Sequence, residues 1–355
     1  MIGISLLTLV PGASGAGSER YARDLCRGLA RWGSRAYVAL LPGIAPDAAG
    51  ELPARVIAAY PGGRSVPGRA LAMARAIARP GPVLSEMLAD GVDALHFPLV
   101  GMIPRTVRTP SVVSIPDVQH SVHPEFFSRA ERLYRRWMYA RTAEAARIVV
   151  TMSGFSAGSL MRHLGVPAGK IRVIPHGVDP ERFHPGATPR EPFLLYPANF
   201  WPHKNHARLF EAFASVRAHR PEVTLILTGA GHGRCTLPEG VLSRGLVSND
   251  ELVRLYQTAC ATVFPSLWEG FGLPPVEAMA CGCPVVVSRG TSLPEVCGEA
   301  ARYVDPFSPR DIASGIEDVL RNPAGLVEAG RRRAAQLTLE ACVQAHDAVY
   351  GELAA

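Results

Sequence analysis

The strongest constraint on the fold is an apolar strand, a glycine turn and a helix that follow one another within residues 261–280. Residues 261–264 are apolar and β-prone, which predicts a buried strand. Gly270 and Gly272 predict a turn, and the two prolines after them stand where the start of a helix tolerates proline. The backbone N–H groups of such a turn and the positive end of the helix dipole favour a negatively charged ligand. The segment therefore predicts an anion-binding turn.

Two carboxylates flank this turn, eight positions apart. Glu277 is placed to accept hydrogen bonds from the vicinal hydroxyls of a ribose, as acidic residues do in other nucleotide-binding folds. Glu269, nearer the turn, is placed to do the same for a sugar hydroxyl. The same spacing fits a second interpretation. In it Glu277, near the third helical position, only caps the helix, and Glu269 is a solvated turn residue. The spacing alone leaves both interpretations open.

The rest of the chain alternates between predicted strands and helices, which favours parallel sheets with helices on both faces. Its 355 residues suffice for two domains of ordinary size, and 48% hydrophobic with 19% charged residues fits large cores. Prolines and glycine punctuate residues 175–185, which predicts a hinge. We therefore expect one domain in residues 1–185 and a second in residues 186–336.

Three further segments place polar or glycine residues directly after predicted strands, where ligand sites of open α/β sheets lie. The first is a glycine-rich loop over residues 11–17, which does not match the dinucleotide fingerprint. The second contains Asp117 and His120. The third contains Lys204, whose ammonium group is placed to meet a diphosphate. A tight turn explains the first segment equally well, and a polar capping loop explains the second.

The positive charge is concentrated in the N-terminal half. Residues 1–185 carry 22 Lys+Arg and 13 Asp+Glu, whereas the remainder carries 15 and 18, within a net charge of +6. This asymmetry suggests an anionic partner, and an anionic membrane surface leads because the sequence shows no nucleic-acid-binding module. The predicted helix over residues 129–145 carries arginines beside Trp137, which suits a membrane surface or a solvated helix face. An arginine-rich composition explains the charge as well.

Cysteine usage and hydropathy bear on the cellular location. The seven cysteines show no metal-ligand spacing, so we expect free core thiols in a reducing cytoplasm and no bound metal. No apolar run reaches the ~18 residues of a transmembrane helix, and the N-terminal strand lacks the charged start of a signal peptide. We expect a cytoplasmic protein, with peripheral contact to the inner membrane face as an open alternative.

The stretch EGFGLPPVE, with its continuation AMACGCPVVVS, resembles the E-x7-E signature of the retaining nucleotide-sugar glycosyltransferases of family 4. The resemblance spans nearly the whole chain and is strongest over residues 193–305. It implies the α/β fold called GT-B, in which two doubly wound Rossmann-like domains face a cleft. The first domain would bind the acceptor and the second the nucleotide-sugar. It also implies that the last helix, within residues 337–355, crosses back to the first domain.

The resemblance assigns roles to individual residues. Glu277 would hold the ribose of the donor, Glu269 its sugar or phosphate side, and Lys204 its phosphates. Asn199 replaces the arginine that partners the lysine in the family, so binding would depend more on Lys204 and the turn amides. Backbone groups near Val247 would meet the nucleobase.

The N-terminal domain departs from the family at one position. The stretch PDVQHSVHPEFFS is similar to the family's "HD…HPEFFS" segment, but Pro116 occupies the position of the histidine. Asp117 matches the family, and His120 is the candidate substitute for the missing histidine. The expected catalytic residues are Lys204, Glu269, His120 and Asp117. The expected binding residues are Gly15, Ala16, Gly17, Asn199, Lys204, Val247, Glu269, Gly270, Phe271, Gly272, Leu273 and Glu277.

Together these features predict a retaining, metal-independent glycosyltransferase that moves a hexosyl group from a nucleotide-sugar to a saccharide, a lipid-linked saccharide or a natural product. The stretch PANFWPHKNH resembles mannosyl- and rhamnosyl-type members of the family. Same-face attack, with the leaving phosphate as base, is the route that the resemblance implies. Two alternatives stay open: a non-catalytic binding partner of an active transferase, and a nucleotide-sugar epimerase.

Overall fold

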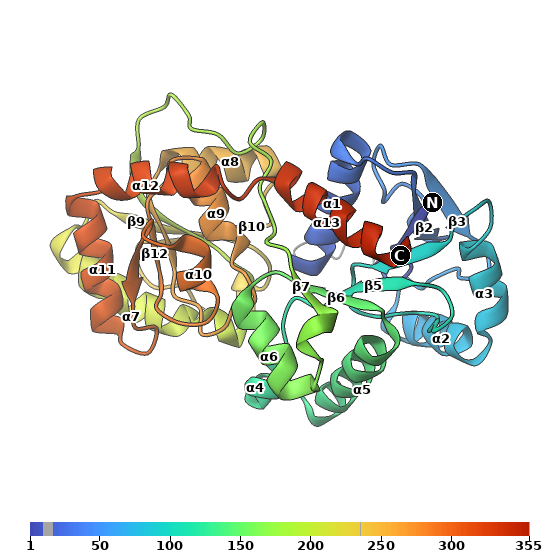
Figure 1. Cartoon of the computed structure of the whole chain (residues 1–355). Helices are drawn as coiled ribbons and strands as arrows, with labels where there is room; N and C mark the ends of the chain where they lie inside the picture. The colour runs from blue at the N-terminus through green and yellow to red at the C-terminus, as the bar shows by residue number, and fades with distance from the viewer. Residues whose placement is uncertain (10–16, 235, 355) are drawn as a thin grey trace. The chain divides into compact units, whose positions relative to one another are not determined.

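A computed structural model describes residues 1–9, 17–234 and 236–354 of the chain (Figure 1). These residues form two compact units. One unit contains residues 1–175 together with the C-terminal residues from 339 onward, and the other contains residues 176–338.

The boundary between the two units lies at residue 175, whereas the sequence predicted it at residue 185. The residues after Pro175 belong to the second unit because they are fastened to it. Val178 donates a backbone hydrogen bond to Leu337 O at 2.9 Å. Phe183 is buried and packs edge-on against Tyr256, with ring centroids 6.4 Å apart.

The first unit is built on a seven-stranded sheet in which all paired strands are parallel. The sheet has the order β3-β2-β1-β4-β5-β6-β7. Its strands are β1 (Ile2–Ser5), β2 (Tyr37–Pro42), β3 (Ala54–Ile57), β4 (Ala94–Phe97), β5 (Ser111–Ser114), β6 (Ile148–Thr151) and β7 (Ile171–Val173). The five central strands are buried along their whole length, as expected for a parallel sheet that is covered on both faces.

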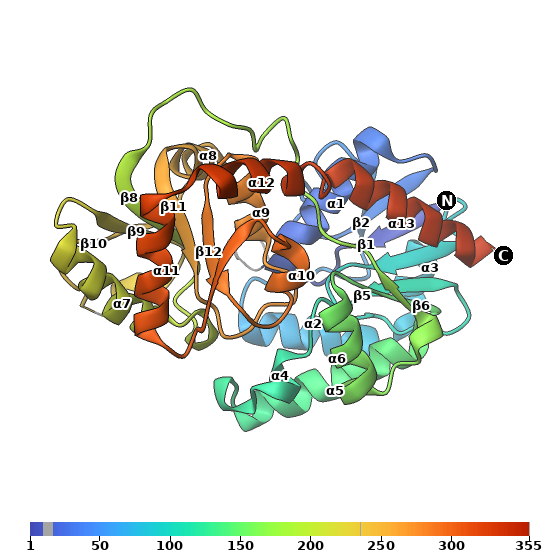
Figure 2. The same ribbon diagram turned by 60° about the vertical axis from the view of Figure 1, so that its left-hand side comes forward.

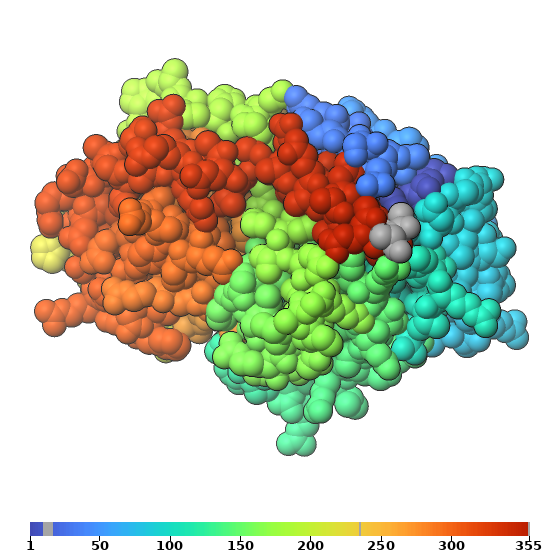
Figure 3. All heavy atoms as spheres, viewed as in Figure 1, coloured from blue at the N-terminus to red at the C-terminus, as the bar shows by residue number. Residues whose placement is uncertain are grey.

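Helices cover both faces of this sheet (Figure 2). Its helices are α1 (Gly17–Trp32), α2 (Val66–Ala78), α3 (Pro80–Met87), α4 (Gln119–Val122), α5 (Arg129–Ala145), α6 (Gly154–Leu164) and α13 (Leu339–Ala354). The first and last of these, α1 and α13, lie side by side, and Figure 3 shows the red C-terminal atoms against blue N-terminal ones. Side chains of α2, α3, α5 and α6 share a hydrophobic cluster with one face of the sheet. Ser153 accepts a hydrogen bond from the N–H of Ser156 and caps α6, as its position predicts.

The sequence and the structure of this unit differ at two places. The apolar run over residues 2–10 predicts a single strand, but β1 ends at Ser5, and Leu9 N donates a hydrogen bond back to Leu6 O in a turn. The helix α3 was not predicted, because its sequence PGPVLSEM begins with three residues that usually mark a loop. Its two prolines lie in the first turn, where a helix tolerates them.

A buried hydrogen-bond network ties α13 to the sheet. Tyr21 Oη of α1 lies 2.9 Å from Ser114 Oγ and 2.7 Å from His346 Nε2 of α13. His96 of β4 bridges Ser114 Oγ, at 2.8 Å, and Tyr350 Oη, at 2.7 Å. Burial holds the pKa of His96 well below and that of Tyr350 well above its usual value, so both side chains stay neutral.

The second unit contains a six-stranded parallel sheet of order β10-β9-β8-β11-β12-β13. Its strands are β8 (Glu191–Pro197), β9 (Thr224–Thr228), β10 (Val241–Gly245), β11 (Ala259–Phe264), β12 (Val285–Ser288) and β13 (Ala301–Val304). Its helices are α7 (His206–His219), α8 (Asn249–Thr258), α9 (Leu273–Ala280), α10 (Leu293–Cys297), α11 (Pro309–Arg321) and α12 (Ala324–Ala334). The fold class predicted from the sequence, two Rossmann-like α/β units, is confirmed.

The strand order of the second unit locates its candidate site. The chain runs outward from β8 to β9 and β10, then returns to the other side of β8 with β11. Ligands of open parallel sheets bind beyond the carboxyl ends of the strands at such a reversal of strand order. The loops after β8 and β11 are those that contain Lys204 and Glu269.

Across the described residues, no helix is both long and apolar enough to cross a membrane.

Candidate functional site

Lys204 and Glu269 form an ion pair where the strand order of the second unit reverses. Lys204 Nζ lies 2.6 Å from Glu269 Oε1, and each side chain is only 12% exposed. Lys204 Nζ also lies 5.0 Å from the centre of the Phe264 ring, within the range of a cation–π contact. The loops after β8 and β11 thus bring together a cation and an anion from positions 65 residues apart in the chain.

Asn205 holds the Lys204 loop against the turn after β11. It adopts a left-handed backbone conformation, with φ of 62°, between a short 3-10 turn and α7. Its Nδ2 donates hydrogen bonds to Pro265 O at 3.0 Å and to Pro306 O at 2.7 Å. A backbone hydrogen bond from Leu267 N to His203 O, at 2.7 Å, joins the same two loops. Asn205 therefore fixes the position of the lysine beside it.

The glycine turn is built as the sequence predicts. Gly272 has φ of +94° and ends the turn directly before α9. The positive φ favours glycine, and a Cβ atom there would lie 2.5 Å from Leu293 Cδ2, so a larger residue would also displace the Leu293 side chain. Ser292 Oγ donates a shared hydrogen bond to the backbone carbonyls of Glu269 and Phe271, at 3.0 Å each, and so stabilises the conformation of the turn.

Glu277 is placed differently from the expectation. It is the fifth residue of α9 and not the third, so it lies in the second turn, and the capping interpretation is wrong. Its side chain is fully buried, and its Oε2 accepts a hydrogen bond from Tyr256 Oη at 2.8 Å. A carboxylate buried here against α8 supports the packing of α8 and α9, and its role toward a ribose stays a prediction.

The remaining candidates of the second unit lie in the surrounding loops. Asn199 Oδ1 accepts a hydrogen bond from the N–H of Ala230 at 2.7 Å, so this residue joins the loops after β8 and β9. Val247 lies partly exposed between β10 and α8, and Leu273 is the first residue of α9. Gly270 is buried within the turn. Their roles toward a donor stay predictions.

A buried histidine supports the lysine loop from the helix behind it. His206, the first residue of α7, packs against Tyr196, with ring centroids 4.8 Å apart, and against Phe200 at 4.5 Å. Burial, His232 and Lys204 together lower the pKa of His206 to about 3. A neutral imidazole thus leaves Lys204 as the cationic group of this loop.

The structure describes three of the five candidates of the first unit. Gly15 and Ala16 lie outside the described residues, and Gly17 is the exposed first residue of α1. Asp117 Oδ1 accepts a hydrogen bond from the N–H of Gln119 at 2.9 Å, which is a local capping contact before α4. His120 is buried and meets the Tyr139 ring edge-on at 4.6 Å.

The described residues contain no group of three or more His, Cys, Asp or Glu side chains that could hold a metal ion. The six cysteines among them are free thiols.

Two family models match the chain. The model described as Glycosyl transferases group 1 matches residues 178–336, which include the whole Lys204–Glu269 site. The model described as Glycosyltransferase Family 4 matches residues 15–182. The chain belongs to the group 1, family 4 glycosyltransferases that these two models describe.

Curated relatives of this protein include two bacterial mannosyltransferases. The MMP alpha-(1->4)-mannosyltransferase of Mycolicibacterium hassiacum is 30% identical over 69% of the chain and 63% of its own length. The O-antigen chain mannosyltransferase B of Escherichia coli is 28% identical over 60% of the chain and 61% of its own length. The matched stretches thus span less than two thirds of these relatives.

Solved structures show that the family 4 chain has the GT-B fold. A sucrose-phosphate synthase from Thermosynechococcus elongatus superimposes with a TM-score of 0.79 at 21% identity, covering 99% of this chain and 98% of that one. The Anabaena protein HepE, solved in complex with UDP and glucose, gives a TM-score of 0.74 at 18% identity and covers 99% and 100% of the two chains.

Sequence reasoning missed the residues that hold the site in place. Asn205, Ser292 and Tyr256 each bond to a group that lies 21 to 101 residues away in the chain. The one local signal was Asn205, because an asparagine between a lysine turn and a helix is a common left-handed position. No pattern in the sequence marks the other two.

Proposed function

We propose that this protein is a retaining glycosyltransferase that transfers a hexosyl group from a nucleotide-sugar. The observation that carries the proposal is the Lys204–Glu269 pair, held beside a glycine turn and a helix start at the reversal of strand order. This arrangement offers an ammonium group and backbone amides to a diphosphate, and a carboxylate to the sugar attached to it.

The chemistry assigned to these groups is stabilisation of the leaving group. As the bond between the anomeric carbon and the phosphate oxygen breaks, negative charge develops on the diphosphate. Lys204 and the N–H groups at the start of α9 would balance that charge, so we propose that the reaction needs no metal ion. The acceptor oxygen would bond to the anomeric carbon on the face that the diphosphate leaves, and its proton would pass to the departing phosphate.

The choice of donor and acceptor extends this proposal. The names of two relatives favour a mannosyl donor, and the Anabaena structure holds UDP with glucose. We propose a mannosyl- or rhamnosyl-type hexose as the transferred group, and a saccharide, a lipid-linked saccharide or a natural product as its acceptor. A cytoplasmic location, with peripheral membrane contact through the basic first unit, belongs to the same proposal.

The test is a transfer assay with a panel of GDP-, UDP- and dTDP-sugars in the presence and absence of EDTA. We expect transfer or slow donor hydrolysis with one nucleotide, no loss with EDTA, and an unchanged anomeric configuration in the product. Lys204→Met should lower kcat/KM by ~10²–10³, the usual effect of removing one leaving-group stabiliser. Lys170→Met is the matched control, because Lys170 is the only other lysine and its Nζ donates to Glu144 O in the first unit.

A second candidate function, that of a non-catalytic binding protein, is favoured by two observations. Glu277 is fully buried under Tyr256, and the family's histidine and arginine positions hold Pro116 and Asn199. Such a protein would bind a nucleotide-sugar tightly and neither transfer nor hydrolyse it. Isomerisation of the donor without any acceptor would instead identify an epimerase.

A further inference from the structure

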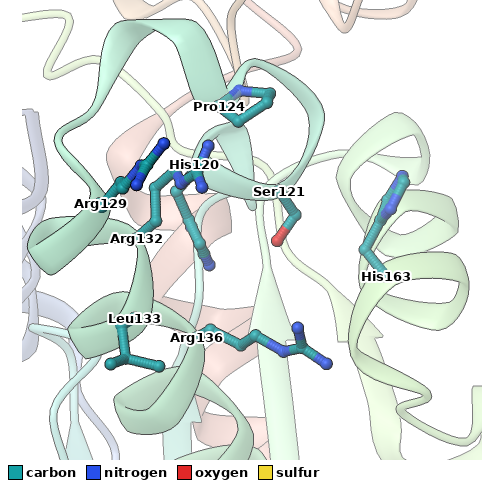
Figure 4. Close-up of a pocket in the computed structure, with 8 residues that line it drawn as sticks. All are labelled: His120, Ser121, Pro124, Arg129, Arg132, Leu133, Arg136 and His163. Atoms are coloured by element: carbon teal, nitrogen blue, oxygen red, sulfur yellow. The ribbon is translucent and has the colours of Figure 1, made fainter.

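A second candidate binding site lies wholly in the first unit. The helices α4, α5 and α6 surround a pocket of about 560 Å³, a volume typical of small-molecule sites (Figure 4). Its cationic and titratable lining residues are Arg129, Arg132 and Arg136 of α5, His120 of α4 and His163 of α6. No acidic residue lines it. The pocket therefore presents concentrated positive charge without a built-in counter-charge.

The three arginines are uncompensated. They follow one another at intervals of three and four residues, which places them on one face of α5 over about 10 Å. Among the described residues, none of these three guanidinium groups has an ion pair or hydrogen bond. Like charges at this spacing destabilise a helix by a few tenths of a kcal/mol per pair. Elsewhere in the same unit arginines are paired, as Arg172 is with Glu352.

His120 provides independent evidence for a ligand. Its side chain is 4% exposed, yet its Nε2 has no hydrogen-bond partner in the described part of the chain. In Figure 4 its imidazole lies beside Arg129 and Arg132 in the wall of the pocket. A buried polar atom of this kind normally has a partner, since leaving it unsatisfied is costly. Burial and the nearby Arg135 lower the pKa of His120 to about 4, so it offers a neutral N–H donor.

One apolar side chain lines the pocket. Leu133 is 72% exposed. An exposed aliphatic side chain beside arginines suits a ligand with an apolar part next to its anionic group.

We propose that this pocket binds a phosphate-bearing ligand, with Arg129, Arg132 and Arg136 contacting its oxygens and His120 donating a hydrogen bond. Guanidinium groups bind phosphate oxygens through strong, charge-assisted hydrogen bonds. The three arginines extend over about 10 Å of α5, which is long enough to contact more than one anionic group. The same chemistry is found in a lipid headgroup and in a soluble phosphate ester, and the exposed Leu133 in the pocket lining favours the lipid. The proposal does not depend on the nucleotide site of the second unit.

The experiment measures binding of two probes to the full chain. The soluble probe is inorganic pyrophosphate, followed by calorimetry, and the lipid probe is phosphatidylcholine vesicles with and without phosphatidic acid, followed by co-sedimentation. We expect at least one probe to bind, and the double variant Arg132→Gln/Arg136→Gln to weaken that binding about 100-fold, at ~10-fold for each guanidinium removed. Binding of pyrophosphate alone assigns the pocket to a soluble ester, and binding that requires phosphatidic acid assigns it to a lipid.

A charge-matched control separates a pocket from a generally basic surface. The double variant Arg141→Gln/Arg162→Gln removes the same charge from α5 and α6 outside the pocket lining. We expect it to change affinity by less than about 3-fold, with screening by salt as the only cause. Failure of both probes to bind the unaltered chain, or an equal loss in the two double variants, would overturn the proposal.

Two further readouts test the assignment of residues. In NMR titrations the ring resonance of His120 should shift on adding the probe that binds, and its pKa should rise, because an anion beside it favours the protonated form. Lys204→Met should leave binding to the pocket unchanged, while the Arg132/Arg136 variant should keep any nucleotide-induced rise in melting temperature. An unmoved His120 resonance, or loss of pocket binding in Lys204→Met, contradicts the proposal, whatever becomes of the glycosyltransferase activity.

Discussion

The ion pair between Lys204 and Glu269 can be tested by a double-mutant cycle on stability. The perturbations are Lys204→Met, Glu269→Gln and the two combined. Both side chains are 12% exposed and their charged atoms lie 2.6 Å apart. With an effective dielectric constant of ~20, the Coulomb attraction at that distance is about 6 kcal/mol. Desolvation of two largely buried charges offsets much of it.

The expected costs follow from this balance. Removing one partner of a buried pair costs ~3–5 kcal/mol, because the other charge is left uncompensated. The residual exposure of this pair reduces that to about 2–3 kcal/mol for each single variant. The double variant should cost only about 1–2 kcal/mol, since both desolvation penalties disappear with the charges. The cycle therefore predicts a coupling energy of about 3 kcal/mol between Lys204 and Glu269.

The assay is urea denaturation of the full chain, followed by a probe in the second unit such as the fluorescence of Trp268, which is buried there. Binding of a nucleoside diphosphate without a sugar provides a second readout. Glu269→Gln should tighten it, because Lys204 loses its competing partner, and Lys204→Met should weaken it. Additive single variants, with a coupling below about 0.5 kcal/mol, would refute the pairing on which the site is built.

Three further predictions concern the support of the site and its response to pH. Asn205→Ala should cost ~2–3 kcal/mol, because it removes hydrogen bonds to two carbonyls and keeps a left-handed φ that alanine disfavours; Asn205→Gly, which keeps only the backbone freedom, separates the two effects in urea denaturation. Gly272→Ala should cost ~1–3 kcal/mol and weaken nucleotide binding, since alanine disfavours the positive φ and its Cβ would displace the buried Leu293 side chain; an unchanged melting temperature would contradict this. The pKa of His206 is lowered to about 3, below its unfolded value of ~6.5, so the unfolded chain takes up a proton first as the pH falls. The free energy of unfolding should therefore decrease below pH 6.5, by up to ~1.4 kcal/mol for each pH unit. His206→Gln should flatten the pH dependence of the unfolding free energy between pH 6.5 and 4, and an unaltered slope would show that the imidazole is not buried.

The elements around the site could be predicted from the sequence because their signals are local. A β-prone apolar run before Gly270 and Gly272 allows little other than a buried strand and a turn, and prolines at the next helix start fix where α9 begins. Ser153 marks the start of α6 in the same way. Each of these signals acts within a few residues, so no knowledge of the tertiary structure is needed.

The features that the sequence did not reveal depend on distant parts of the chain. Tyr256 bonds to Glu277 from the preceding helix, and the burial of that carboxylate follows from the packing of α8 on α9. His120 follows a predicted strand, but its edge-on packing against Tyr139 of α5 depends on a helix that comes later in the chain. The hydrogen bond from His96 to Tyr350 of α13 joins residues 254 positions apart. Periodicity and turn chemistry carry no information about such partners.

The most direct test of the central claim is the change in melting temperature of the full chain with GDP, UDP or dTDP. We expect one of the three nucleotides to stabilise the unaltered protein and the Lys170→Met variant equally, by about 2.7 kcal/mol at a ligand concentration 100 times Kd. The Lys204→Met variant should lose most of that stabilisation. If no nucleotide at millimolar concentration raises the melting temperature, or if Lys204→Met responds like the unaltered chain, the proposed nucleotide site at Lys204 is wrong.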